Sequence, residues 1–492
     1  MSLKDLRGWI EKLHEENEIK EITCEVDWNL EIAEIETKLR EKKEGGPALL
    51  FTNIKDYHNT WGKKFFIGSL GSYSKIALAL GLPKNTPPLE IMKIQRERTK
   101  NIIRPIEVSN GPVKDNIIKG NDINLFQFPV LKTHERDGGR YISTFNGVVT
   151  KDPETGWVNV GLYRGMVNED GKSIGVLLAM ATHWGMMAAK YASMKKPMEV
   201  AFVFGGDPLL PYVACSPYMP HVCEYDILGG LRGEPVELVK CETVDLHVPA
   251  HAEIVVEGTI SLDPKDFKVE GPFGEYTGFY GGRKSPKPQV KVTCITFRND
   301  PILQGSVEGP PYDEGALIHS ITASSFALDF LEKNCIIPGV LDAWVPPVTH
   351  GNDIFVKIKK QYQGQAKQIA AALWGAALWW FKNVFVVDED IDIHDYDQLL
   401  WAFSWRVWDY DEDLSVFRGC HGGVLDPSTP PELKDPAKMG GSGRWNRLCI
   451  DATKDWRLEP VEEWGGERFP PLNRYLPTPE KIKKRWKEYG ID

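Results

Sequence analysis

Paired zinc-ligand spacing, long apolar runs and an excess of basic charge are all missing from this 492-residue sequence. Its eight cysteines are scattered and form no Cys-x-x-Cys pair, which argues against a zinc ribbon and favours reduced, buried thiols. No stretch approaches the roughly 20 consecutive apolar residues of a membrane-spanning helix, and the N-terminus lacks the apolar core of a secretory signal. A net charge of −10 argues against nucleic-acid binding. We therefore expect a cytoplasmic protein that binds neither nucleic acid nor membrane.

The length of the chain predicts two or three domains, because single hydrophobic cores stop growing at roughly 250–300 residues. Residues 1–115 alternate helical and strand patterns, and residues 116–306 hold many short strands between Gly, Pro and Asp turns. Residues 307–492 return to the alternation of helix and strand and end in a Pro- and Gly-rich tail. We therefore expect an N-terminal α/β domain, a central β-barrel or sandwich, and a C-terminal α/β domain.

Hydrophobic periodicity places the elements of each domain. In the N-terminal domain it predicts helices at 3–16 and 30–42 and strands at 19–26 and 48–51. In the central domain it predicts one helix after His183 and strands at 157–166, 173–179, 198–204, 254–261 and 289–297. In the C-terminal domain it predicts helices at 317–333, 358–380 and 479–489, and a strand at 384–387 that leads into an acidic loop.

The first candidate for chemistry is the turn from Glu270 to Glu275, which reads EGPFGE and lies between two strands of the expected barrel. Such a turn can aim both carboxylates into one cleft, because glycine permits tight backbone geometry. Two neighbouring carboxylates tend to differ in pKa, since one negative charge disfavours the next, and the pair can divide acid and base roles. The alternative is a surface turn with two solvated glutamates.

The second candidate is the pair Asn159 and Arg164, which lie on one predicted strand. Their five-residue separation places them on opposite faces of an ideal strand. Both can reach one site only if the strand bends, which Gly161 permits. A buried arginine requires an anionic partner, either a carboxylate or a phosphate. The alternative is an arginine that faces outward from the barrel.

The third candidate is His183, which stands after an apolar strand and before a helix. Helix N-termini attract anions, so a histidine there can help to hold a phosphate or can ligate a metal. Asn159, His183 and Glu224 together would make an oxygen and nitrogen set suited to Mg²⁺ or Mn²⁺ rather than to Zn²⁺ or an iron–sulfur cluster. Taken alone, such a histidine is more often a structural or capping residue.

Five segments stand in order over about 270 residues: FPVLKTHERDGGRY at 128–141, NVGLYR at 159–164, THW at 182–184, EGPFGEYTGF at 270–279 and VVDEDIDI at 386–393. Together they resemble the UbiD family of prenylated-flavin decarboxylases. The resemblance covers nearly the whole chain. It favours a catalytic role for Glu270 and Glu275 over the surface turn.

The resemblance implies a role for each candidate residue. Arg164, Glu270 and Glu275 would form the catalytic ionic network, with Glu275 as the proton donor. The residues implied to bind a divalent ion at the cofactor phosphate are Asn159, His183 and Glu224. The full set implied for cofactor binding is Asn159, Gly161, Leu162, Tyr163, Arg164, Thr182, His183, Cys215, Ser216 and Glu224.

The resemblance also implies a fold, cofactors and partners. The central domain, residues 116–306, would be a split, flavin-reductase-like β-barrel that binds the cofactor, between the N-terminal α/β domain and a C-terminal α/β oligomerisation domain. The implied cofactors are prenylated FMN and Mn²⁺ or Mg²⁺, with K⁺ as a further candidate. The implied partners are a small carboxylic acid, CO₂ and a flavin prenyltransferase that supplies the cofactor. Assembly as a homodimer or a homohexamer is also implied.

The implied activity is the reversible, non-oxidative decarboxylation of an aromatic or α,β-unsaturated acid. Departing CO₂ leaves an electron pair that side chains stabilise poorly, and a cofactor carries this chemistry. Tyr276, after the second glutamate, and His319, on the following helix, are the candidate substrate-facing residues. The alternatives are an enzyme that works as a carboxylase, a non-catalytic subunit of a multi-subunit aromatic carboxylase, and an ordinary flavin reductase.

The sequence departs from the family pattern at two positions. Related enzymes often place a lysine against the cofactor phosphate where this chain has Ala376. A glutamine that commonly precedes the metal-binding histidine is Thr182 here. Contacts to the phosphate would then come from backbone amides or from Lys382.

Overall fold

The computed structural model describes residues 3–42, 45–180, 182–376, 380–434, 443–473 and 478–490. The chain divides into two compact units. The first contains residues 1–322 and 423–443, and the second contains residues 323–422 and 444–492. Over the described ranges, no helix combines the length and the apolar composition needed to cross a membrane.

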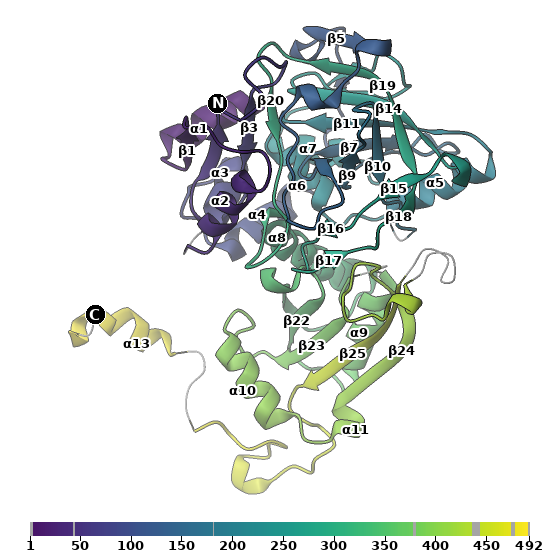
Figure 1. Cartoon of the computed structure of the whole chain (residues 1–492). Helices are drawn as coiled ribbons and strands as arrows, with labels where there is room; N and C mark the ends of the chain where they lie inside the picture. The colour runs from purple at the N-terminus through teal and green to yellow at the C-terminus, as the bar shows by residue number, and fades with distance from the viewer. Residues whose placement is uncertain are drawn as a thin grey trace. The chain divides into compact units, whose positions relative to one another are not determined.

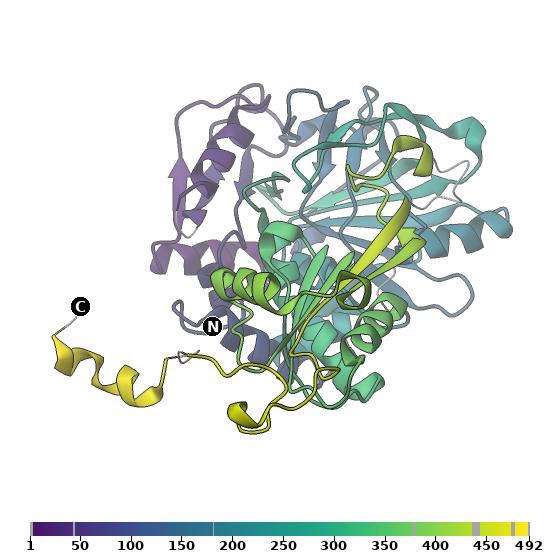
Figure 2. The same ribbon diagram turned by 90° about the horizontal axis from the view of Figure 1, so that it is seen from below.

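The N-terminal elements of the first unit, purple in Figures 1 and 2, combine helices with a small sheet. Among the described residues this sheet has the strand order β1–β2–β3–β20, with the bounds β1 Ile19–Ile22, β2 Ala48–Phe51, β3 Lys64–Ile67 and β20 Ile302–Gln304. The helices are α1 Leu6–Glu15, α2 Glu31–Arg40, α3 Tyr73–Ala79 and α4 Pro88–Arg98. The Asp5 carboxylate caps α1 by accepting a 2.8 Å hydrogen bond from the Gly8 amide. The predicted α/β alternation is confirmed, although the predicted strand 19–26 ends at Ile22.

The centre of the first unit is a large antiparallel sheet that curls into a half-barrel (Figure 1). Within the described residues it has nine strands in the order β6–β9–β10–β19–β14–β11–β7–β8, with β5 paired to β19. The bounds are β5 Asn116–Lys119, β6 Arg140–Ser143, β7 Gly147–Lys151, β8 Val158–Gly161, β9 Gly165–Val167, β10 Ser173–Val176, β11 Met198–Phe204, β14 Ile254–Ser261 and β19 Gln289–Phe297. The expected central split β-barrel is confirmed.

Three long strands, β11, β14 and β19, carry the core of this sheet. They lie side by side with β14 in the middle. Phe202 and Phe204 on β11, Val256 on β14 and Ile295 on β19 are all buried. Burial of each such side chain stabilises the fold by about 1.5–3 kcal/mol. The predicted bounds of all three strands are confirmed, because each is an apolar run with turn residues at both ends.

The predicted strand 157–166 is wrong as a single element. It consists of β8, which pairs with β7, and β9, which pairs with β6 and β10. Between them the Leu162 amide donates to the Ala214 carbonyl at 3.1 Å and leaves the ladder. Asn159 on β8 and Arg164 before β9 are therefore freed from the strict alternation of one strand.

Among the described residues, three helices accompany the half-barrel: α5 His183–Ser193, α6 Leu209–Cys215 and α7 Glu224–Arg232. α6 and α7 pack against each other, and all three helices contact β8 (Figure 1). This packing brings Asn159 in β8 near His183 at the start of α5 and Glu224 at the start of α7. The helix predicted after His183 is confirmed.

Short strands hold the EGPFGE turn between β14 and β19. β15 Lys268–Glu270 pairs with β18 Ser285–Lys287, and β16 Phe273–Gly274 pairs with β17 Tyr280–Gly281. Another small sheet contains β4 Ile106–Glu107, β12 Glu237–Lys240 and β13 His247–Pro249. The turn thus forms two hairpins of its own, outside the large sheet.

The second unit contains a mixed sheet. Its described strands have the order β21–β22–β23–β25–β24, with the bounds β21 Val340–Trp344, β22 Asp353–Ile358, β23 Asn383–Asp388, β24 Leu414–Gly422 and β25 Gly443–Ala452. Strands β22, β23 and β25 are parallel to one another. The helices are α9 Gln365–Ala376, α10 Tyr396–Arg406, α11 Tyr410–Asp413 and α13 Glu480–Arg485, and α8 Glu314–Asp329 contributes to both units.

Two predictions for the C-terminal part are wrong. The predicted helix 358–380 starts too early, because its first residue ends strand β22 and α9 begins at Gln365. Residues 377–379 of that prediction lie outside the described residues. The Pro- and Gly-rich tail contains a long strand, β25, whose burial alternates along GRWNRLCIDA. Neighbouring glycines and prolines concealed that period-2 pattern.

Candidate active site

Arg164 lies between two buried glutamates. Its Nε and Nη2 donate to Oε1 and Oε2 of Glu270 at 3.1 and 3.0 Å, and its Nη1 donates to Oε1 of Glu275. The three side chains are only 8%, 0% and 4% exposed. A bidentate arginine–carboxylate pair is strong and directional. The three residues that the sequence groups as an ionic network are thus in direct contact.

Tyr141 adds a further donor to this network. Its hydroxyl donates to Oε1 of Glu270 at 2.8 Å, and its ring packs on Phe273 with the centroids 4.3 Å apart. Arg164 lies over the same Phe273 ring, with Cζ 5.5 Å from the centroid. Glu270 therefore accepts hydrogen bonds on both oxygens, as an ionised carboxylate does.

Asp137 anchors the EGPFGE turn from the other side. Its Oδ1 accepts from the Gly274 amide at 2.8 Å. Its Oδ2 accepts from the Thr133 hydroxyl at 2.9 Å and the His134 amide at 2.8 Å. Burial opposes ionisation of Asp137, but hydrogen bonds from His134 and Gly274 outweigh it and hold the pKa below its usual value. The carboxylate thus ties residues 128–141 to the turn.

Negative charge is in excess around Arg164. Burial raises the pKa of Glu275, an effect that Arg164 opposes and that the charges of Glu270 and Asp137 increase. Burial also raises the pKa of Glu308 well above its usual value, and Asp313 and Glu275 add to the shift. A single guanidinium fully paired with Glu270 cannot also neutralise Glu275 and Glu308. The arrangement therefore favours a proton on the Glu275 side of the cluster.

A second cluster joins Asn159, His183 and Glu224. The Asn159 amide nitrogen lies 2.8 Å from Oε1 of Glu224 and 3.4 Å from Nδ1 of His183. The Val160 amide donates to Oε2 of Glu224 at 2.7 Å. The three residues predicted as metal ligands thus meet on β8, α5 and α7.

The chemistry of this second cluster fits a divalent cation. Burial lowers the pKa of His183 to about 4, which leaves a neutral imidazole with a free lone pair. Burial raises the pKa of Glu224 to about 8, and in the described part of the chain no lysine or arginine forms an ion pair with it. A buried carboxylate without a cationic partner beside a neutral histidine and an amide oxygen matches the ligands of Mn²⁺ or Mg²⁺. No described group of three His, Cys, Asp or Glu side chains forms a metal-site cluster, so a site here depends on Asn159.

Tyr163 connects the two clusters along the chain. Its hydroxyl donates to Oδ1 of Asn159 at 3.1 Å, and its ring stacks on Trp184 with the centroids 4.1 Å apart. Gly161 lies against this ring, where a Cβ atom would come within 2.4 Å of it. The segment from Gly161 to Arg164, with Leu162 between, is thus held in one conformation beside both clusters.

Thr182 and Ser216 use their hydroxyl groups within the fold. Oγ1 of Thr182 accepts from the Gly185 amide at 3.3 Å and donates to the Ala179 carbonyl at 2.6 Å, so it caps α5. Oγ of Ser216 donates to the Tyr212 carbonyl at 2.7 Å. Their contacts to a cofactor stay predictions.

Cys215 and His319 meet at the ends of α6 and α8. Sγ of Cys215 lies 3.2 Å from Nε2 of His319. Burial raises the pKa of the Cys215 thiol well above its usual value, so it is neutral. Burial likewise raises the pKa of Tyr276, which the charges of Glu275 and Glu308 increase further. The substrate-facing role of Tyr276 and His319 stays a prediction.

The proposed phosphate contacts lie in the second unit. Ala376 is the last residue of α9, and Nζ of Lys382 lies 5.7 Å from the centroid of the Trp445 ring. A role for Lys382 at the phosphate stays a prediction.

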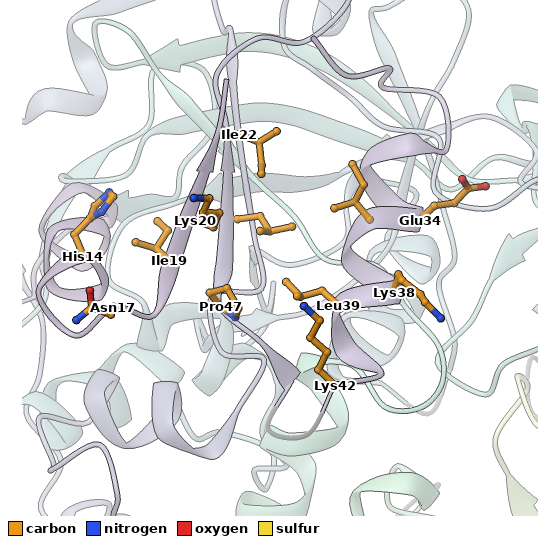
Figure 3. Close-up of a pocket in the computed structure, with 12 residues that line it drawn as sticks. His14, Asn17, Ile19, Lys20, Ile22, Glu34, Lys38, Leu39, Lys42 and Pro47 are labelled. Atoms are coloured by element: carbon orange, nitrogen blue, oxygen red, sulfur yellow. The ribbon is translucent and has the colours of Figure 1, made fainter. Parts of the chain in front are cut away.

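A surface groove of about 900 Å³ lies elsewhere, along β1 and α2 (Figure 3). Ile19, Ile22 and Leu39 form its apolar wall, and Lys20 and Lys42 stand at its rim. All of its lining residues fall within 14–49. The groove is therefore separate from the Arg164 and Glu224 clusters.

Three family models match the chain in succession. They are described as the 3-octaprenyl-4-hydroxybenzoate carboxy-lyase N-terminal domain, Rift-related domain and C-terminal domain, and they cover residues 10–95, 104–311 and 316–452. The chain belongs to the UbiD family. It is accordingly an enzyme of the carboxy-lyase class.

Relatives of the UbiD chain span its whole length. An uncharacterized protein of Aquifex aeolicus is 36% identical over 514 residues, with 99% of each chain covered. One of Archaeoglobus fulgidus is 34% identical, with 94% of this chain and 95% of the relative covered.

Solved structures of UbiD-class enzymes share the fold. Vanillic acid decarboxylase of Sedimentibacter hydroxybenzoicus, in its closed form, is 31% identical with a TM-score of 0.87, and 99% of each chain is covered. HmfF of Pelotomaculum thermopropionicum in complex with FMN is 28% identical with a TM-score of 0.79, over 99% of this chain and 100% of that one. An evolved dimeric form of HmfF in complex with prFMN is 27% identical with a TM-score of 0.78, over 99% of each chain.

Three residues of the UbiD site escaped the sequence analysis: Tyr141, Asp137 and Glu308. Tyr141 and Asp137 stand in FPVLKTHERDGGRY, so the motif marked their segment without giving their contacts. Glu308 follows a buried strand, where a carboxylate is unusual enough to have been a signal.

Proposed function

We propose that this chain is a prenylated-FMN-dependent enzyme that exchanges CO₂ on an aromatic or α,β-unsaturated carboxylic acid, with Glu275 as the proton donor. One observation carries the proposal: Arg164 is buried between two glutamates and is fully paired with only one of them. Such a pair of carboxylates in different environments can divide the roles of acid and counter-ion.

The support for the cofactor comes from the neighbours and from the fit of the residues. One solved relative carries FMN and another carries prFMN. Prenylated FMN, when bound, would supply the electron sink for the pair that departing CO₂ leaves. Asn159, His183 and Glu224 would hold Mn²⁺ or Mg²⁺ at its phosphate, with K⁺ as a further ion. The N-terminus of α5 would add favourable backbone amides.

Arg164 would orient the carboxylate of the substrate. A guanidinium has five N–H groups. Three of them are used by Glu270 and Glu275, which leaves two for an incoming carboxylate. Glu270 would stay ionised and fix the position of Arg164. Glu275 would then give its proton to the substrate carbon that CO₂ leaves, and take it back in the carboxylation direction.

The substrate class is supported by the vanillic acid decarboxylase neighbour and by the polar side chains beside the site. Tyr276 and His319 would contact the ring or its hydroxyl groups. We further propose a cytoplasmic homodimer or homohexamer, and a flavin prenyltransferase as the supplier of the cofactor. A dimeric form of HmfF among the neighbours supports a dimer.

The test is to produce the chain with and without a flavin prenyltransferase, and then to screen CO₂ release over a panel of aromatic and unsaturated acids. Absorbance and mass spectra should identify prenylated FMN in the first preparation, and only that preparation should release CO₂. Equal activity in both preparations would remove the cofactor assignment. A loaded enzyme that exchanges ¹³CO₂ with none of the acids would remove the proposed reaction.

A further inference from the structure

The Tyr141 hydroxyl is buried on the side of Glu270 that faces the protein interior. Tyr141 is 2% exposed and forms a small core cluster with Met166 and Phe273. Its position is fixed by β6, where it lies opposite Met166, and its amide donates to the Leu131 carbonyl at 2.9 Å. A side chain so enclosed reaches the substrate only through another residue.

Hydrogen bonding treats the two glutamates unequally. Oε1 of Glu270 receives Nε of Arg164 and the Tyr141 hydroxyl, and Oε2 receives Nη2 of Arg164. A proton placed on either oxygen of Glu270 would point at a donor. In the described part of the chain, Glu275 receives Arg164 on Oε1 alone, so its Oε2 is open to a proton.

We propose that Tyr141 is a positioning residue that keeps Glu270 ionised and so leaves the shared proton on Glu275. This inference rests on the proposed function, in which Glu275 is the proton donor. The hydroxyl stabilises the charged form of Glu270 only, because a phenol O–H donates to a carboxylate and has a poor acceptor in a carboxylic acid. Tyr141 would thus decide which of the two glutamates can act as an acid.

The other charged groups around the pair act in the same sense. Lys287 interacts with Glu270, and Asp137 and Glu308 face Glu275. None of the three donates a hydrogen bond to Glu270 in the described structure, so the hydroxyl is the contact that a conservative change can remove alone.

The experiment compares the pH profile of kcat/KM for the cofactor-loaded wild type and Tyr141→Phe. The phenylalanine keeps the ring on Phe273 and removes only the hydroxyl. Without it Glu270 takes up a proton more readily, so the acid limb of the profile should move up by about one pH unit, and the alkaline limb should stay in place. The plateau should also fall, since part of the enzyme then carries its proton on Glu270.

Tyr57→Phe is the matched control. Tyr57 is also a buried tyrosine, 3% exposed, and its hydroxyl contacts the guanidinium of Arg140. This variant should lose comparable stability and keep both limbs. An acid limb of Tyr141→Phe that coincides with that of the wild type would overturn the proposal, as would an equal shift in Tyr57→Phe.

A second variant keeps the proposal testable where Tyr141→Phe folds poorly. A fluorinated tyrosine at position 141 has a more acidic hydroxyl and donates a stronger hydrogen bond, so the acid limb should move down in pH. Tyr141→Phe should also change turnover little in a Glu270→Gln background, because the two residues act as one unit. Full additivity of the two changes would contradict the proposed role.

Failure of the proposed function has a different signature. In that case the loaded wild type would release no CO₂ from any acid, and no profile would exist. An active wild type with an unshifted Tyr141→Phe profile would leave the function in place and remove only the role of Tyr141.

Discussion

Arg164 meets Glu270 side-on, with Nε 3.1 Å from Oε1 and Nη2 3.0 Å from Oε2. This geometry uses one edge of the guanidinium and leaves Nη1 for Glu275. A point charge such as a lysine ammonium cannot hold both carboxylates at these positions. The planar fork of arginine therefore sets the distance between the two glutamates.

Arg164→Lys should lower turnover by about 10²-fold, because a displacement of a reacting group by about 1 Å costs that much. Cofactor content should change little, since the Asn159, His183 and Glu224 cluster is separate. The measurement is CO₂ release at saturating substrate together with the flavin spectrum of the purified variant. Turnover close to that of the wild type would show that Arg164 acts only as a charge.

Glu275→Gln should lower turnover by roughly 10²–10⁴-fold while the cofactor stays bound, because the amide keeps the shape and cannot deliver a proton. Incorporation of solvent deuterium into the product carbon should slow in parallel. The matched control is Glu253→Gln: Glu253 is fully buried and paired with Arg7 at 3.0 and 3.1 Å, outside the site. The control should lose stability and keep turnover. A Glu275→Gln variant with normal turnover would make another group the proton donor.

Gly281→Ala should displace the proton donor without changing its chemistry. A Cβ atom at this position would lie 2.2 Å from Cγ of Glu275, and the residue belongs to the short strand β17. The side chain of Glu275 must then move away from Arg164. We expect turnover to fall by about 10²-fold with little loss of flavin. Normal turnover would show that Glu275 works equally well in another rotamer.

Much of the fold could be predicted from local sequence patterns. The apolar strands β11, β14 and β19 have clear turn residues at both ends, and their bounds were predicted correctly. Strand β25 was missed because its alternation stands in a Gly- and Pro-rich tail. β22 was merged into a helix because a short apolar run leads directly into polar residues with helical spacing.

The site could be predicted only as far as motifs extend. Ordered landmarks grouped Arg164 with Glu270 and Glu275, although periodicity alone placed Arg164 on the wrong face of a strand. Tyr141 is 129 residues from Glu270 in the sequence, and Asp137 is 137 residues from Gly274. Contacts over such separations depend on how distant strands pair, and no local pattern encodes them.

Tyr163→Phe should weaken the proposed metal site without removing a ligand. The Tyr163 hydroxyl donates to Oδ1 of Asn159 at 3.1 Å and so orients the amide. Loss of such an outer hydrogen bond typically costs about 10–100-fold in metal affinity. The measurement is Mn²⁺ content and binding by calorimetry, with Glu224→Gln as a variant that should lose the ion and the flavin together. Full Mn²⁺ occupancy in Glu224→Gln would remove this cluster as the metal site.

Asp137→Asn should loosen the EGPFGE turn. The carboxylate accepts hydrogen bonds on both oxygens, from the Gly274 amide and from Thr133 and His134. An amide presents a donor to one of these donors, and an unsatisfied buried group costs about 1–3 kcal/mol. Thermal unfolding at neutral pH should therefore occur at a lower temperature, and the Gly274 amide should exchange faster with solvent.

The same carboxylate predicts how this loss depends on pH. The pKa of Asp137 is lower in the folded chain than its usual value of 3.8, because hydrogen bonds from His134 and Gly274 outweigh burial. A group with a depressed pKa stabilises the fold above its unfolded value, and this contribution is lost as the pH falls through the folded value. The difference in stability between the wild type and Asp137→Asn should therefore be constant from neutral pH down to about pH 5 and shrink below about pH 4. A difference that stayed the same at low pH would mean that the turn is held by contacts other than the ionised carboxylate.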